Sequence, residues 1–224
     1  MKFVLRYIVT ALVGLVVFGL IVFWPAGTFD YWQGWAFIAV FAVSTNLPSI
    51  YLLVKNPAAL KRRMRAGPAA ETRPLQRVII SVALVSMVAM IVVSALDFRF
   101  GWSSVPAAMC IVGDVLVAAG LLFTMLVVIQ NGYAAANITV ESGQELVSTG
   151  VYGIVRHPMY LGNIALMIGT PFALGSFWGL VFVIPGLLVL GIRIVDEEKV
   201  LTAELAGYPD YARQVHYRLV PCVW

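Results

Sequence analysis

Three long stretches of the chain contain no charged residue, and they restrict what this sequence can fold into. They are residues 7–29, 31–54 and 78–96, each close to the ~20 residues that an α-helix needs to cross a bilayer. The chain is 61% hydrophobic and 12% charged, whereas an ordinary soluble domain is about 45–50% apolar and roughly 25% charged. A soluble core does not require so many uncharged segments. These stretches therefore predict three membrane-spanning helices.

The basic residues are concentrated between the second and third stretches. Seven of the fifteen Lys and Arg residues lie between Lys55 and Arg77, together with a single acidic residue, Glu71. Because short loops rich in Lys and Arg remain in the cytosol, this loop and the N-terminus are predicted to be cytosolic. The same location explains the net charge of +4 without a nucleic-acid partner, and it favours contact with membrane lipids instead.

The second half of the chain divides into four segments. Residues 105–129 form a fourth apolar stretch that returns the chain to the cytosol, and a polar loop follows it. Residues 158–192 are again uncharged but are interrupted at Gly175 and Ser176, which predicts two helices of about 16 residues each, short for full spans. The last 30 or so residues are charged and amphipathic.

Together these segments predict an all-α protein, a polytopic membrane helical bundle. It has four spanning helices, a short C-terminal helical hairpin and a cytosolic amphipathic tail. The predicted division is a four-helix membrane region, 1–129, followed by a C-terminal region, 130–224, that carries the chemistry.

Few reactive side chains lie inside the apolar stretches. Asp114 is in the fourth stretch, where a carboxylate suggests either function or a contact with another helix or water. Cys110 lies in the same stretch and is predicted to pack in the protein interior. With Cys222 it makes only two cysteines, which form neither a disulfide framework nor a metal site. No metal is predicted.

The predicted topology brings two polar clusters to the cytosolic boundary. The first runs from Arg156 to Gly162 and places Pro158 where a helix would begin, a position that favours proline. The second, residues 193–199, contains Arg193 and Glu197 at a spacing of four, so the two side chains can pair on one helix face. Each of these residues, taken alone, also fits an ordinary role in a membrane protein. An arginine can set the topology, the glutamates can be solvated charges at a helix end, and the aromatic residues can be interfacial anchors.

The combination of the clusters resembles a known family. The motifs are Arg-His-Pro-Met-Tyr-Leu-Gly at 156–162, Glu-Glu-x-x-Leu at 197–201, and a Tyr-rich tail that begins at Gly207 and reaches Pro221. They are similar to those of the isoprenylcysteine carboxyl methyltransferase and phospholipid methyltransferase group over about residues 143–224. The first motif also occurs in membrane sterol reductases that use NADPH. A reductase and a non-catalytic membrane relative therefore stay open as alternatives to an S-adenosylmethionine-dependent methyltransferase.

The resemblance implies roles for particular residues. His157 and Tyr160 would contact S-adenosyl-L-methionine, Tyr152 and Gly162 would shape its pocket, and Arg193, Glu197 and Glu198 would form the catalytic group. Glu197 or Glu198 would bind polar groups of the cofactor, and Arg193 would orient an anionic acceptor or pair with Glu197. The full implied cofactor-binding set is Tyr152, Arg156, His157, Pro158, Tyr160, Gly162, Glu197 and Tyr211.

The acceptor is expected to be lipophilic, because the predicted pocket lies at the edge of the bilayer. A prenylated cysteine carboxylate, a phospholipid amine, a thiol or another small lipophile fits this position. The strand, GxGxxG and helix pattern of a dinucleotide-binding fold is absent from the sequence. The resemblance implies instead that the cofactor is held between the Arg-His-Pro helix start and the final helix.

Overall fold

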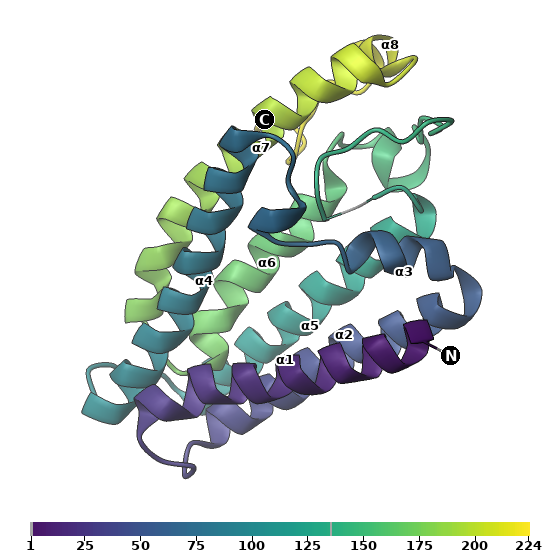
Figure 1. The fold of residues 1–224 in the computed structure, drawn as a ribbon. Coiled ribbons are helices and arrows are strands. Elements are labelled where there is room, and N and C mark those ends of the chain that lie inside the picture. The colour runs from purple at the N-terminus through teal and green to yellow at the C-terminus, as the bar shows by residue number, and fades with distance from the viewer. Residues whose placement is uncertain (1, 135) are drawn as a thin grey trace.

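The computed structural model describes residues 2–134 and 136–224, and all the regular structure in that part of the chain is helical. Figure 1 shows the helices as a bundle with α8 beyond one end. The α-helices are α1 (Lys2–Ala26), α2 (Trp32–Lys55), α3 (Pro57–Arg63), α4 (Pro74–Phe100), α5 (Ala107–Gln130), α6 (Pro158–Ala173), α7 (Val183–Glu204) and α8 (Tyr208–Gln214), and the 3₁₀ turns are η1 (Pro68–Ala70), η2 (Gly150–Gly153) and η3 (Trp178–Phe182). The predicted all-α class is confirmed.

Five helical segments of the described chain are long and apolar enough to cross a membrane, which makes this a multi-pass membrane protein. Four of them are the predicted spans. The fifth is Trp178–Glu204, 27 residues long, which combines η3 with α7. The expectation of two short helices after Pro158 is therefore correct for α6, with 16 residues, and wrong for α7. That helix continues through the charged residues after Arg193, because their partners lie on other elements.

Helices α5 and α6 pack with their backbones in close approach, and glycines make this possible. A Cβ added at Gly120 would lie 2.5 Å from the Gly162 carbonyl oxygen, and one added at Gly162 would lie 2.5 Å from the Gly120 carbonyl oxygen. Two turns along, a Cβ at Gly169 would lie 2.7 Å from the Gly113 carbonyl oxygen. Small residues at such contacts let membrane helices pack tightly.

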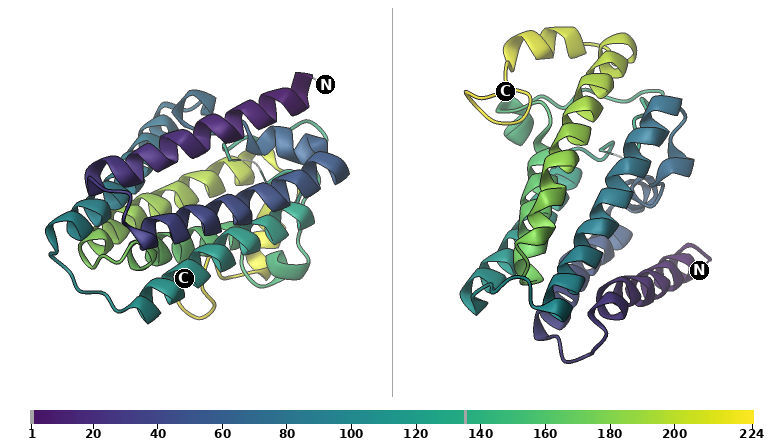
Figure 2. Two further views of the ribbon diagram at one scale, coloured as in Figure 1. Left: turned by 90° about the horizontal axis from the view of Figure 1, so that it is seen from below. Right: turned by 90° about the vertical axis from the view of Figure 1, so that its left-hand side faces the viewer.

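The alternating direction of the long helices brings many segments together at one end of the bundle. The N-terminus, α3, the start of α6 and the end of α7 lie at this end, beneath α8 (Figures 1 and 2). The basic loop between α2 and α4 belongs to the same end, so the charge pattern predicts that this end is cytosolic.

The opposite end of the bundle is held by a buried carboxylate. Asp97 accepts hydrogen bonds from the Ser103 backbone N–H and hydroxyl, both at 2.6 Å, and from the Ser176 hydroxyl at 2.5 Å. This joins the end of α4 to the turn between α6 and η3. Asp114 is also buried, and its Oδ1 has no hydrogen-bond partner in the described part of the chain. Cys110 is buried, as predicted.

Candidate functional site

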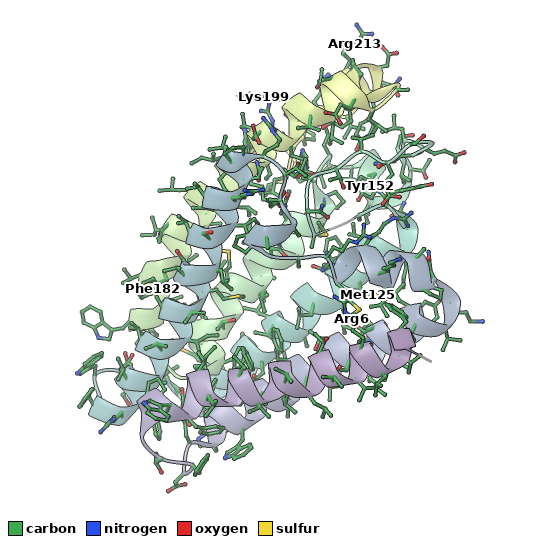
Figure 3. The ribbon with its side chains drawn as sticks, viewed as in Figure 1. Arg6, Met125, Tyr152, Phe182, Lys199 and Arg213 are labelled. Atoms are coloured by element: carbon green, nitrogen blue, oxygen red, sulfur yellow. The ribbon has the colours of Figure 1, made fainter. Side chains whose placement is uncertain are left out.

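A cleft opens at the end of the bundle that carries the Arg-His-Pro segment. It measures about 760 Å³ with its open side included. Figure 3 shows Tyr152 in the loop region at this end, below Lys199 and Arg213. The cleft is lined by seven of the predicted site residues: Tyr152, Arg156, His157, Pro158, Tyr160, Glu197 and Tyr211.

The start of α6 is positioned by local sequence and by the C-terminal tail. Pro158 occupies the first helical turn, where its missing N–H costs nothing. The preceding residues pair with the tail: the Arg156 N–H donates to the Tyr217 carbonyl at 2.9 Å, and the His157 N–H donates to the Arg218 carbonyl at 2.8 Å. The tail therefore holds the beginning of the helix, as well as covering it.

Glu198 joins three parts of the chain. Its carboxylate accepts from Arg156 Nε and from Arg218 Nε, both at 2.8 Å, and the His157 Nε2 lies 3.3 Å away. Arg156 also donates to the backbone carbonyls of Ala212 and Val215. The Arg156 guanidinium is thus committed to holding the tail, and the carboxylate of Glu198 faces these partners while Glu197 lines the cleft.

Glu197 and Arg193 are connected through Tyr160. The Tyr160 hydroxyl donates to Glu197 Oε2 at 2.5 Å and accepts from Arg193 Nε at 3.1 Å. The direct Arg193–Glu197 pair that the spacing predicts is therefore wrong: the tyrosine hydroxyl lies between the two charged groups. Because Tyr160 is buried, this arrangement is fixed in orientation.

The guanidinium of Arg193 is held by residues outside the two predicted polar clusters. Its NH1 donates to Glu71 Oε1 at 3.0 Å and to Gln76 Oε1 at 2.7 Å, and NH2 donates to the Ala136 carbonyl at 2.9 Å. Gln76 in turn contacts Asp196, which also pairs with Arg73. One signal pointed to this network: Glu71 is the single acidic residue in the basic loop.

Three tyrosines form the wall of the cleft on the side of η2 and α8. The Tyr211 hydroxyl donates to the Tyr152 carbonyl at 2.7 Å, and the Tyr152 hydroxyl accepts from Asn131 Nδ2 at 3.2 Å. Burial raises the pKa of Tyr152 to about 12, so its hydroxyl is neutral at physiological pH. The buried Tyr208 hydroxyl has no partner in the described residues, and Tyr208 is part of the cleft lining.

Gly162 has a different location from the one that the resemblance implies. The structure places it in the contact between α5 and α6, against Gly120 and Thr124, and not in the lining of the cleft. Its missing side chain permits helix packing, which in turn positions Tyr160 one half-turn earlier in α6.

A second cavity adjoins the cleft inside the bundle. It lies between α4, α6 and α7, measures about 1050 Å³ with its open side included, and is largely apolar. Met159 and Tyr160 line both the cleft and this cavity. The polar cleft and the apolar cavity therefore meet at Tyr160, next to Glu197.

Residues 108–207 match the family model described as phospholipid methyltransferase. This match includes both polar clusters, so the resemblance to this integral membrane methyltransferase family is confirmed for that segment. It supports a membrane methyltransferase.

Two known proteins share further similarity. The Delta(14)-sterol reductase TM7SF2 of Mus musculus is 29% identical over 93 residues, which are 39% of this chain and 22% of the reductase. The chain thus matches about a fifth of that relative's length. The solved eukaryotic intramembrane Ras methyltransferase ICMT (isoprenylcysteine carboxyl methyltransferase) aligns with 98% of this chain and 86% of its own, at 16% identity and a TM-score of 0.48.

Proposed function

We propose, from the premise that residues 108–207 belong to the phospholipid methyltransferase family, that this protein transfers a methyl group from S-adenosylmethionine to a lipophilic acceptor. The observation that carries the proposal is the junction at Tyr160, where the polar cleft meets an apolar cavity within the bundle. A water-soluble donor and a membrane-soluble acceptor can approach each other only at such a junction.

The residues of the cleft fit the donor. Its sulfonium is positively charged, and Glu197 supplies a carboxylate in the lining while Tyr133, Tyr152 and Tyr160 supply aromatic rings, which attract cations. The unpartnered Tyr208 hydroxyl can satisfy a polar group of the adenosine or of the amino acid. Arg156 is committed to Glu198, so the proposal assigns it the positioning of the tail.

The chemistry needs an aligned electrophile and nucleophile. When bound, S-adenosylmethionine supplies a methyl carbon to which the acceptor's electron pair bonds, while the carbon–sulfur bond breaks and its electron pair stays on sulfur. The protein supplies mainly position. Tyr160 orients Glu197 through its hydroxyl, and Arg193 holds that hydroxyl because Glu71 and Gln76 fix the guanidinium. The tail, joined through Glu198, borders the cleft with Tyr208 and Tyr211.

The apolar cavity supports an acceptor with a hydrocarbon chain. Its lining combines aliphatic residues with several methionines, which adapt to irregular shapes. A prenylated cysteine carboxylate has such a chain, and so does a phospholipid.

The similarity to a sterol reductase makes NADPH-dependent reduction the second candidate, because the matched reductase segment covers 39% of the chain. Ligand-induced stabilisation separates the two. A ligand that binds only the folded protein at 100 times its Kd stabilises it by about 2.7 kcal/mol.

Purified protein in detergent is heated with S-adenosylhomocysteine, with NADPH or with neither. We expect the unfolding midpoint to rise with S-adenosylhomocysteine alone. Transfer of a labelled methyl group to prenylcysteine, phospholipid and thiol acceptors then follows. If the unfolding midpoint rises with NADPH and does not rise with S-adenosylhomocysteine, the protein is a reductase and the proposal of methyl transfer is wrong.

A further inference from the structure

Arg63 is a cation without an anionic partner in the described chain. Its NH1 donates to the sulfur of Met159 at 3.3 Å, and no carboxylate of the described residues lies within ion-pair distance of it. Two other arginines of the segment between α2 and α4 do have such partners: Arg62 pairs with Glu141, and Arg73 pairs with Asp196. The Arg63 side chain is partly buried, and this burial lowers the pKa of its guanidinium.

The position of Arg63 relates it to the proposed acceptor site. It is the last residue of α3 and lines the apolar cavity, and Met159, which it contacts, immediately precedes Tyr160. It also lines a groove between α1 and α2 that contains Tyr7, Thr45 and Asn46. The guanidinium thus lies where the cavity approaches the cytosolic end of the bundle.

The other cation of the cavity cannot take this role as readily. Arg193 is the second charged residue in the lining, but Glu71, Gln76 and Tyr160 already occupy its donors. An anion that entered the cavity would meet Arg63 as the uncompensated charge. Arg63, and not Arg193, is therefore the better candidate to orient an anionic acceptor.

We propose that Arg63 is a further acceptor-binding residue, whose guanidinium binds the anionic group, a carboxylate or a phosphate, of an acceptor with its hydrocarbon chain in the cavity between α4, α6 and α7. This inference rests on the proposed methyl transfer for its use, although the binding that it describes can be measured without turnover. Both anions match the planar fork of a guanidinium.

Binding by Arg63 has a consequence that depends on the anion. If a carboxylate is itself the acceptor, methylation gives a neutral ester, which loses its ion pair with Arg63 and leaves the site more easily. If a phosphate occupies Arg63, the charge persists after methylation elsewhere on the molecule.

The experiment measures displacement of an uncharged fluorescent prenyl amide from the purified protein in detergent, so that the affinity of the probe does not depend on Arg63. The competitors share one prenyl chain and differ in the head group: a prenylcysteine with a free carboxylate, its carboxamide, and a prenyl phosphate. The variants are Arg63→Gln and Arg63→Lys, with Lys61→Gln as the matched control, since Lys61 is an exposed cation in the same helix.

We expect Arg63→Gln to lower the affinity for the preferred anionic competitor. The loss should be about tenfold to a hundredfold, as for the loss of a charged hydrogen bond. Binding of the carboxamide should be unchanged, Arg63→Lys should retain part of the anion affinity, and Lys61→Gln should retain all of it. The larger loss among the carboxylate and the phosphate identifies the head group.

Equal weakening of the carboxamide and the anions, or no weakening of either anion, would overturn the assignment of Arg63. If these binding differences are found and no acceptor is methylated, the proposed function fails while the anion site stands.

Discussion

The substitution Glu198→Gln tests whether the tail is fastened to the bundle by the ion cluster around this carboxylate. The variant keeps the shape of the side chain and removes its charge. Glu198 binds Arg156 and Arg218 at 2.8 Å each, and the side chains of these two arginines are 8% and 35% exposed. The buried Arg156 contact should therefore dominate.

The magnitude follows from these environments. A hydrogen bond to a charged group contributes about 1.5–3 kcal/mol, which we assign to Arg156, and a more exposed pair such as Arg218 adds less than about 1 kcal/mol. The expected loss is about 2–4 kcal/mol, which lowers the midpoint of a chain of this size by roughly 4–16 °C.

Thermal unfolding in detergent, followed with limited proteolysis of the tail, measures this effect. We expect earlier unfolding, faster cleavage between Gly207 and Trp224, and a smaller midpoint rise with S-adenosylhomocysteine. The control is Glu204→Gln, because Glu204 is exposed on the same helix. If Glu198→Gln unfolds and is cleaved as the wild type is, Glu198 does not hold the tail.

Three further substitutions probe the junction and its support. Tyr160→Phe removes the hydroxyl that orients Glu197, and labelled methyl transfer should show kcat/KM falling about tenfold to a hundredfold; an unchanged value would contradict the role of Tyr160. Gly162→Ala introduces a Cβ 2.5 Å from a backbone oxygen of α5 and should cost about 1–3 kcal/mol in thermal unfolding, whereas Gly14→Ala, in open space, should cost nothing. Tyr208→Phe removes a hydroxyl without a partner in the described chain, so apparent stability without ligand should be unchanged. The main effect should be a drop in affinity for S-adenosylhomocysteine, measured by calorimetry. Equal affinity would mean that this hydroxyl does not contact the ligand.

The recognition of the C-terminal site illustrates both the reach and the limit of sequence patterns. The motif around Arg156 and the Glu-Glu pair pointed to one end of the bundle, and seven of the implied residues line one cleft there. The pattern did not separate the two adjacent glutamates. Successive residues on a helix point about 100° apart, so Glu197 faces the cleft while Glu198 faces the tail.

The network around Arg193 could not be found from local spacing. Its partners Glu71 and Gln76 are more than a hundred residues away in the chain, and no periodicity relates them to α7. The i, i+4 rule described the face that Arg193 and Glu197 share, but Tyr160 from a neighbouring helix inserts its hydroxyl between them.

The sequence by itself determined the properties that depend on neighbouring residues. Hydropathy over about 20 residues predicted the first four spans, the basic loop predicted the sidedness of the bundle, and Pro158 marked the start of α6. Each follows from interactions of one segment with lipid, water or its own backbone.

Only the tertiary structure decided how those segments use their polar groups. It extended α7 through its charged end, placed Gly162 against α5, committed Arg156 to Glu198 and left Arg63 facing the apolar cavity without an anion. The physical reason is that a buried charge is stabilised by whichever partner the packing of distant helices brings within hydrogen-bond distance. That distance is a property of the assembled bundle.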